Sequence, residues 1–193
     1  MARALVGAVA AAVAMFIIGF IFFVTPLQKI AVGSLGDLQA ASVQSALAAH
    51  LPGTGTYYVP SGDTRAQSEM YARGPVATVH YNIHGFAPAS SSAMVMGFVQ
   101  LLIVALLMAA ALYTLSRHVA RFADQATVLG LFVVAVVGYL RFGEPIWFHQ
   151  PWGYAIYMFV AECVSLGVAG FIILKLLLPT SARAAPAGAT SDL

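Results

Sequence analysis

Apolar residues are gathered into four long runs, with polar segments between them. The runs cover residues 4–24, 93–115, 126–142 and 154–178, and the third is the shortest unless Phe122 belongs to it. A helix of about 20 apolar residues crosses the ~30 Å hydrocarbon core of a bilayer. The pattern therefore predicts a mainly α-helical integral membrane protein with four transmembrane helices.

The longest polar segment, residues 29–92, separates the first apolar run from the second and is rich in Gly, Pro, Ser and Tyr. Ser34, three residues before an aspartate, predicts the capped start of a helix that continues to His50. Residues 56–59 and 76–81 contain β-branched and aromatic residues and are bounded by Gly and Pro, which is typical of two short strands. We expect a small external α+β loop domain here.

The same pattern divides the chain into four parts. They are an anchor transmembrane helix (1–28), an extracytoplasmic loop domain (29–92), a three-helix transmembrane region (93–178) and a cytoplasmic tail (179–193). The first apolar run is longer than that of a signal peptide, so we expect it to be retained. The tail holds mainly small and polar residues that bury little apolar surface, which predicts disorder.

Lysine and arginine near the helix ends indicate the orientation. If the N-terminus is cytoplasmic, most of the basic residues that flank the helices lie on the cytoplasmic side, as the positive-inside rule requires. The aromatic residues around the third polar segment then gather at the outer interface, where amphipathic rings are favoured. We expect both termini to be cytoplasmic. The basic residues at that face are Arg3, Arg117, Arg121, Lys175 and Arg183.

Composition narrows the class of function. The chain is 61% apolar and 8% charged, and it has no basic cluster interleaved with aromatic residues, so nucleic acid is not an expected partner. Cys163 is the only cysteine, which leaves no intramolecular disulfide and no cysteine-based metal site. There is no P-loop, dinucleotide-binding glycine motif or nucleophile elbow. We therefore favour a non-enzymatic protein and predict no cofactor.

Arg141 and Glu162 are ionisable residues predicted to lie within the membrane, where such residues often mark function. If residue 126 stands at the inner boundary, Arg141 lies ~22 Å up the third helix and Glu162 about 12 Å below the outer boundary. These depths allow a salt bridge between the two. Alternatively, Arg141 extends to the headgroups, and Glu162 is protonated or hydrogen-bonded to a neighbouring helix.

The segment between the third and fourth runs combines carboxylate, imidazole and indole side chains. Pro145 predicts that the third helix ends at residues 143–145, which leaves a rigid turn at the outer interface. Its carboxylate and imidazole suit proton transfer or metal ligation, or the turn simply sits among lipid headgroups. The residues of this turn are Glu144, Trp147, His149 and Trp152.

Two further spacings bear on candidate sites. His80 and His84 are four residues apart, but in the predicted strand they stand about 13 Å apart, so we predict no metal site there unless His149 joins them. Small residues recur at every fourth position of the last run, a spacing that lets helices approach closely. These predicted packing residues are Ala161, Ser165 and Ala169.

Short motifs give the chain a resemblance to a group of proteins. The loop domain contains Tyr57-Tyr58-Val59-Pro60 and, later, Gly74-Pro75, and a tryptophan-rich turn from Trp147 to Trp152 precedes the last helix. With one anchor helix and three later helices, this pattern resembles small uncharacterised inner-membrane proteins of bacteria. The resemblance implies location in the bacterial inner membrane, with residues 29–92 in the periplasm. It implies no activity.

Three classes of function remain open. The first is a non-enzymatic accessory, assembly or interaction subunit of a membrane complex, whose partners are the lipid bilayer and other membrane protein subunits. The second is a small transporter or proton-conducting protein that uses Arg141, Glu162 and Glu144. The third is a membrane enzyme with a metal at its outer face, bound by His149, Glu144 and His80.

Overall fold

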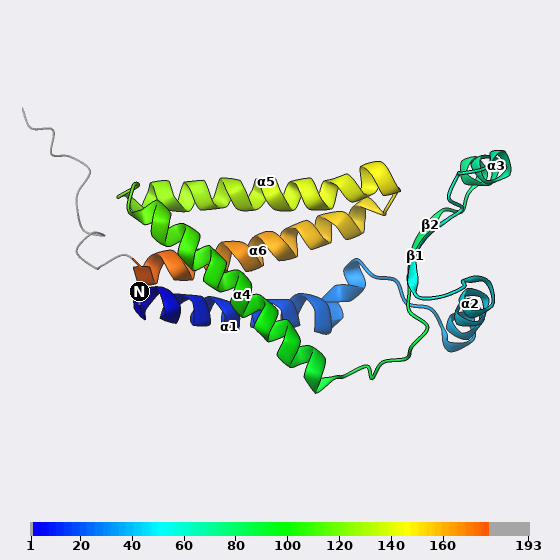
Figure 1. Ribbon diagram of the computed structural model, residues 1–193, viewed down its shortest axis with the longest axis horizontal. Coiled ribbons are helices and arrows are strands. Elements are labelled where there is room, and N and C mark those ends of the chain that lie inside the picture. The colour runs from blue at the N-terminus through cyan, green and yellow to red at the C-terminus, as the bar shows by residue number, and fades with distance from the viewer. Residues whose placement is uncertain (1, 178–193) are drawn as a thin grey trace, which may run out of the picture.

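The computed structural model describes residues 2–177 and is mainly helical, at 74% helix (Figure 1). Four of its helices, α1, α4, α5 and α6, are long and apolar enough to cross a membrane. The remaining elements belong to the segment between α1 and α4. In chain order the elements are α1 (Ala2–Val24), the 3₁₀ helix η1 (Pro26–Ile30), α2 (Asp37–His50), β1 (Gly55–Val59), α3 (Arg65–Arg73), β2 (Ala77–Tyr81), α4 (Ser91–Ser116), α5 (Phe122–Phe148) and α6 (Trp152–Leu177).

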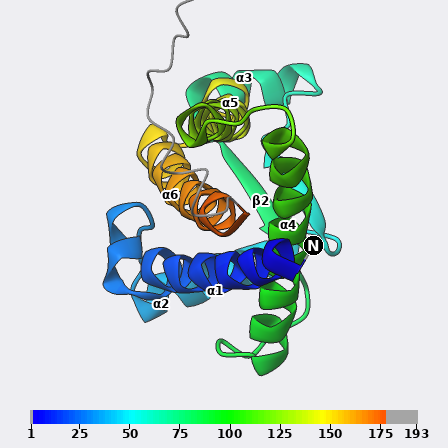
Figure 2. The same ribbon diagram turned by 90° about the vertical axis from the view of Figure 1, so that its left-hand side faces the viewer.

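Helix α6 is the central helix of the bundle. It lies between α1 and α5 and packs closely against both, while α4 crosses the bundle obliquely and packs mainly on α1 (Figure 2). The start of α1 and the end of α6 lie at one end of the bundle, and residues 31–90 lie beyond the other end (Figure 1). This segment, residues 31–90, is called the loop domain below.

Small side chains allow three of the helices to meet in a buried core. The hydrophobic effect does not drive helices together in lipid, so close contact and dispersion must do so. A Cβ atom on Gly7 of α1 would stand 3.5 Å from the Cα atom of Ile173, which shows how nearly the α1 and α6 backbones touch. The buried core residues are Ala8, Ala11, Ala12, Met15, Ala105, Ala109, Leu112, Ala169, Ile173 and Leu174.

The contact between α5 and α6 depends on a glycine. Gly170 of α6 is buried, and a Cβ atom at this position would lie 2.4 Å from Cδ2 of Leu129 on α5. No carbon–carbon contact of that length is tolerated, so any larger residue must displace Leu129. By contrast, a Cβ atom on Gly167, one turn earlier in α6, would have no atom within 4 Å.

The loop domain consists of a two-stranded antiparallel sheet flanked by α2 and α3 (Figure 1). Gly55 pairs with Tyr81 at one end of the ladder and Val59 pairs with Ala77 at the other. Thr64 caps α3, because its hydroxyl accepts the Gln67 amide at 3.2 Å. Between residues 31 and 90 no residue is buried, although 60 residues usually suffice for at least a small core.

The start of α2 differs from the prediction. The helix begins at Asp37 with Gly36 as its N-cap, and no side chain caps it, so Ser34 does not form a capping box. Gly36 adopts an extended conformation (φ −68°, ψ 162°) in which a Cβ atom would lie 2.7 Å from Oε1 of Gln39. The Gln39 side chain lies against Gly36, so a residue with a Cβ atom would be crowded at the N-cap position. The helix therefore begins after Gly36 and not after Ser34.

The end of the third long helix also differs. Helix α5 does not stop at residues 143–145 but continues through Pro145 to Phe148, and it starts at Phe122 rather than at 126. Proline removes one backbone hydrogen bond from this last part of the helix. Burial of the Pro145 ring stabilises the continued helix. The predicted tail, 179–193, lies outside the described residues.

We expect Gly170→Leu to lower the thermal unfolding temperature of the detergent-solubilised protein, because overpacking against Leu129 costs about 1–3 kcal/mol. Gly167→Leu on the same helix is the matched control and should leave the temperature almost unchanged. Adding Leu129→Ala to Gly170→Leu should restore stability. Equal effects at positions 167 and 170 would show that the close α5–α6 contact is wrong.

Candidate functional site

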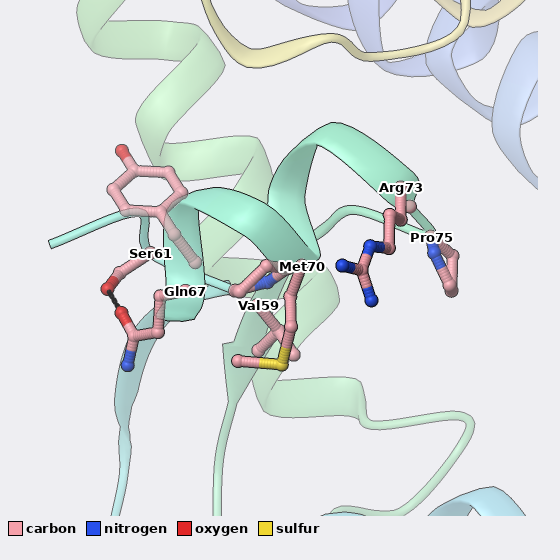
Figure 3. Close-up of a pocket in the computed structure, with 9 residues that line it drawn as sticks. Val59, Ser61, Gln67, Met70, Arg73 and Pro75 are labelled. Carbon is pink, nitrogen blue, oxygen red and sulfur yellow. Dashed lines mark hydrogen bonds between the residues drawn. The ribbon is translucent and has the colours of Figure 1, made fainter. Parts of the chain in front are cut away.

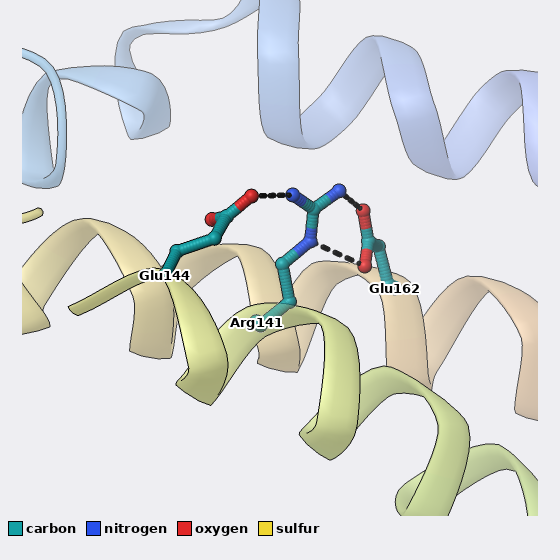
Figure 4. Close-up of polar contacts among 3 residues, drawn as sticks. All are labelled: Arg141, Glu144 and Glu162. Carbon is teal, nitrogen blue, oxygen red and sulfur yellow. Dashed lines mark hydrogen bonds and ion pairs between the residues drawn. The ribbon is translucent and has the colours of Figure 1, made fainter. Parts of the chain in front are cut away.

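Three charged side chains meet where α5 approaches α6, and we call them the ion cluster: Arg141 and Glu144 of α5 and Glu162 of α6 (Figure 4). The Arg141 Nε atom donates to Oε2 of Glu162 at 2.8 Å, and Nη2 donates to Oε1 of the same carboxylate. Nη1 donates to Oε1 of Glu144 at 3.3 Å. The guanidinium thus joins two helices and occupies the space between two carboxylates.

Local geometry explains this arrangement. A spacing of three residues places Glu144 beside Arg141 on the same face of α5. The planar guanidinium matches a carboxylate with two parallel hydrogen bonds, which is the pairing seen with Glu162. All three side chains are 23–28% exposed, so the ion pairs are neither fully screened by water nor fully desolvated. We therefore expect each ion pair to change the free energy of unfolding by an amount between that of a surface pair and that of a buried pair.

The start of α5 at Phe122 changes the depth of the cluster. The helix has 27 residues and is therefore about 40 Å long, which exceeds the ~30 Å hydrocarbon core. Arg141 follows Phe122 by 19 residues, or about 28 Å, rather than the ~22 Å expected from a start at residue 126. If α5 begins at the inner boundary, Arg141 stands near the outer interface.

The ion cluster is not electrically balanced. One guanidinium faces two carboxylates, so the three groups together carry one excess negative charge. In addition, Oε2 of Glu144 is buried and has no hydrogen-bond partner within residues 2–177. A buried carboxylate oxygen without a donor is costly, so this atom is the least satisfied part of the cluster.

A cavity of about 540 Å³ opens between the ion cluster and strand β2. His80 of β2 and His149, which follows α5, both line it, whereas His84 does not. His80 is held by a 3.0 Å hydrogen bond between its Nδ1 atom and the Thr56 hydroxyl of β1. His149 ends α5 in a left-handed conformation, with φ 56°. The lining residues are Val76, Ala77, Thr78, His80, Arg141, Glu144, Phe148, His149, Gln150, Pro151 and Tyr154.

Ring contacts connect the loop domain to the end of α5 beside this cavity. Tyr58 of β1 stacks on Phe148, with ring centroids 5.9 Å apart and planes 2° apart. Tyr71 of α3 contacts the His149 ring, with centroids 5.8 Å apart. Stacking such as that of Tyr58 on Phe148 contributes about 1 kcal/mol to stability beyond the burial of apolar area. The cavity therefore lies at a true junction between the loop domain and the bundle.

The predicted outer turn is shorter than expected and is divided between two elements. Glu144 and Trp147 are in helix α5, His149 is in the connection, and Trp152 is the first residue of α6. Glu144 points into the ion cluster, whereas the Trp147 side chain is 75% exposed. The Trp152 ring lies 6.2 Å from that of Phe142. Glu144 and His149 thus line the same cavity, whereas Trp147 and Trp152 do not line it.

The predicted packing residues lie on the inner face of α6, though not equally. Ala161 and Ala169 are buried and Ser165 is partly buried. Ala169 belongs to the core that α6 shares with α1 and α4. The three predicted packing residues therefore contact other parts of this chain. Cys163, on the same helix, is a partly buried free thiol.

Sequence reasoning missed two polar contacts of the bundle. The Tyr157 hydroxyl donates to the Phe22 carbonyl of α1 at 2.5 Å. Gln125 of α5 is fully buried, and its amide donates to the Val119 carbonyl at 2.5 Å. The one sequence feature that indicated the Gln125 contact is its polar side chain beside an apolar run. Nothing in the sequence indicated that Tyr157 would bind the Phe22 carbonyl.

A second cavity, of about 510 Å³, lies in the loop domain between α3 and the end of β1 (Figure 3). Val59, Met70 and two prolines give it an apolar lining, and Arg73 adds a positive charge. Within residues 2–177, Arg73 forms no ion pair. The lining residues are Tyr58, Val59, Pro60, Ser61, Gln67, Met70, Arg73, Gly74 and Pro75.

Comparison with known proteins does not identify the chain. No family model, no curated protein and no solved structure matches it significantly. The resemblance to small bacterial inner-membrane proteins therefore stays a prediction from the motifs alone.

We expect Arg141→Leu to reduce stability by about 2 kcal/mol, because it leaves two half-buried carboxylates without their cation. The combined Arg141→Leu and Glu162→Leu variant should recover part of the loss, since only one carboxylate, that of Glu144, is then left without its cation. Thermal unfolding in detergent measures both effects. Arg65→Leu, which removes the exposed pair with Glu69, is the control and should have little effect. An Arg141→Leu protein as stable as the wild type would contradict a stabilising role.

Proposed function

We propose that this protein is a non-enzymatic accessory, assembly or interaction subunit of a membrane complex. In this proposal it spans the bacterial inner membrane four times, with both termini in the cytoplasm and the loop domain in the periplasm. The single observation that supports it most is the absence of any buried residue between positions 31 and 90. A folded segment of this length without a core needs a surface to pack against.

Exposed apolar side chains in the loop domain support this reading. Leu38 of α2 is 84% exposed and Phe86, in the connection to α4, is 75% exposed. Helix α2 packs substantially against no other helix or strand within residues 2–177. Large apolar side chains that remain exposed in this way are characteristic of interaction surfaces. We therefore assign the loop domain as the part that contacts another subunit.

The cavity beside α3 suggests how a partner would be recognised. Its apolar lining accommodates an apolar side chain, and the unpaired Arg73 at its edge attracts a carboxylate. We propose that the partner presents an apolar residue next to an aspartate or glutamate. A partner segment with a basic residue at this place would be disfavoured by repulsion from Arg73.

The arrangement of the helix ends supports the proposed orientation. The start of α1 and the end of α6 lie together at one end of the bundle (Figure 1). The exposed Trp147 and Trp152 lie toward the other end, next to the loop domain, where interfacial tryptophans are expected. Arg117 and Arg121, between α4 and α5, fall on the side of the termini, as the positive-inside rule favours.

The test is purification of the tagged full-length chain in mild detergent from membranes of the cell that encodes it. We expect a stoichiometric partner, and we expect Arg73→Glu to reduce its recovery at least about tenfold, or ~1.4 kcal/mol. Arg65→Glu makes the same charge change at the other end of α3 and should leave recovery unchanged. A chain that purifies alone as a monodisperse monomer would refute the proposed function. Undiminished recovery with Arg73→Glu would refute only the role of this cavity.

A second candidate function is transport of protons or another ion. The observation that favours it is the ion cluster, because charged groups within a bundle often line a transport path. We expect, under this alternative, that proteoliposomes take up protons and that Glu162→Gln abolishes the uptake while the surface variant Glu69→Gln does not. Uptake no faster than that of protein-free liposomes would exclude it.

The metal-dependent enzyme, the third possibility, is not favoured by any arrangement of the described residues. Among residues 2–177, no three His, Cys, Asp or Glu side chains stand close enough to hold a metal ion together.

A further inference from the structure

The cavity between the ion cluster and strand β2 has features of a binding site that the interaction role does not use. It is formed by three separate elements, because β2 supplies His80, α5 supplies Glu144 and Phe148, and α6 supplies Tyr154. Its volume of about 540 Å³ falls within the ~300–1,000 Å³ range of small-molecule sites. It is much larger than a bare metal ion requires.

The charges around the cavity favour a cation. Arg141 contributes the only formal positive charge among the lining residues when the imidazoles are counted as neutral, and its guanidinium is already bound to Glu144 and Glu162. The ion cluster retains one excess negative charge. Glu162 does not line the cavity, but its carboxylate is paired with Arg141 at the cavity wall, so the ion cluster as a whole repels an anion and attracts a cation.

The unsatisfied atom of the cluster indicates which kind of group the cavity can bind. Oε2 of Glu144 lacks a hydrogen-bond donor within the described chain, and Glu144 lines the cavity. A carboxylate oxygen accepts strongly from an ammonium N–H. Figure 4 shows that Arg141 approaches Glu144 from one side only, through its other oxygen, Oε1, so Oε2 has no donor. Because Oε2 is buried, a ligand in the cavity reaches it only when the Glu144 side chain turns toward the cavity.

The remaining lining favours an organic cation over a metal ion. Within residues 2–177, no group of three metal-binding side chains occurs, so the two imidazoles do not complete a coordination sphere. Phe148 and Tyr154 instead offer aromatic rings, whose faces attract ammonium groups. Thr78 and Gln150 add polar groups for a neighbouring hydroxyl or phosphate oxygen.

We propose that this cavity binds a primary organic ammonium group, with Glu144 as its counter-ion and Phe148 beside it. Two sources share this chemistry: a free small amine, and the ethanolamine headgroup of a phospholipid. The exposed Trp147 and Trp152 near the cavity place it at the level of lipid headgroups, so both sources have access. Because the cavity joins β2 to α5 and α6, the ligand would fix the loop domain on the bundle. This proposal is independent of whether the loop domain binds a partner.

The first arm of the test titrates ethanolamine into the full-length chain in detergent and measures binding by calorimetry. Ethylene glycol, which has a hydroxyl in place of the ammonium, is the matched ligand control. We expect saturable binding of ethanolamine and none of ethylene glycol. Glu144→Gln should weaken binding at least about tenfold, whereas Glu69→Gln, which changes an exposed arginine-paired carboxylate, should not.

The second arm reconstitutes the chain in nanodiscs with phosphatidylethanolamine or phosphatidylglycerol and measures the lipid retained on extraction by native mass spectrometry. Selective retention of phosphatidylethanolamine, lost in Glu144→Gln, without binding of free ethanolamine assigns the site to a lipid headgroup. Phe148→Leu, which keeps the ion cluster intact, should weaken either ligand several-fold and guards against a folding defect in Glu144→Gln. Binding in neither arm, or equal binding by wild type and both variants, would overturn the proposal.

Discussion

The hydrogen-bonded pairing of Arg141 with Glu162 is the contact on which the half of this molecule next to the loop domain depends. It joins α5 to α6 at the end of the bundle where the loop domain begins, and it holds α5 in place up to Phe148. Phe148 and His149 then contact Tyr58 and Tyr71 of the loop domain. Loss of the ion pair would therefore affect both the packing of α5 on α6 and the position of Phe148 and His149, which the loop domain contacts.

The half of the bundle near the start of α1 and the end of α6 is stabilised differently. There, α1, α4 and α6 meet through alanines and glycines, because dispersion between close backbones must replace the hydrophobic effect in lipid. Met15, Ile173 and Leu174 fill the remaining space. Helix α5 joins this arrangement through Leu129, which packs on Gly170. The bundle thus combines tight apolar packing near the termini with ionic and aromatic contacts near the loop domain.

The loop domain has no buried residue of its own between positions 31 and 90 and so lacks the means to be stable alone. Its sheet has two strands, and a hairpin of this size is marginally stable in water. Helix α2 adds no core, since none of its residues is buried. Ring contacts to α5 anchor one side of the domain, whereas apolar residues such as Leu38 and Phe86 remain exposed. We propose that a neighbouring subunit covers this surface.

Much of the fold could be predicted because lipid imposes a simple pattern. Long apolar runs marked the four long helices, and β-branched and aromatic runs marked both strands within one residue of their observed ends. Prediction failed where a tertiary contact outweighed a local signal. Pro145 predicted a helix end, but its ring is buried within a helix that continues to Phe148. Ser34 was predicted to be the N-cap of the second helix, but Gly36 is the N-cap of α2.

The candidate site was predictable only in part for the same reason. Helix rise placed Arg141 and Glu162 within reach of each other, since depth depends on residue number alone. The cavity depends on how β2 lies against the end of α5, and no local pattern encodes that contact. His80 and His149 consequently line one cavity although 69 positions separate them in the sequence. The hydrogen bond between Tyr157 and Phe22 depends on tertiary packing in the same way.

Hydrogen–deuterium exchange of the full-length chain tests most directly the claim that the loop domain needs a partner. The purified chain in detergent and the chain in its native membrane vesicles would be compared segment by segment. We predict that α2, residues 37–50, exchanges rapidly in the purified chain while the α1–α6 core is protected, and that α2 becomes at least about tenfold slower in native membranes. Strong protection of α2 in the purified chain, unchanged in native membranes, would contradict the account.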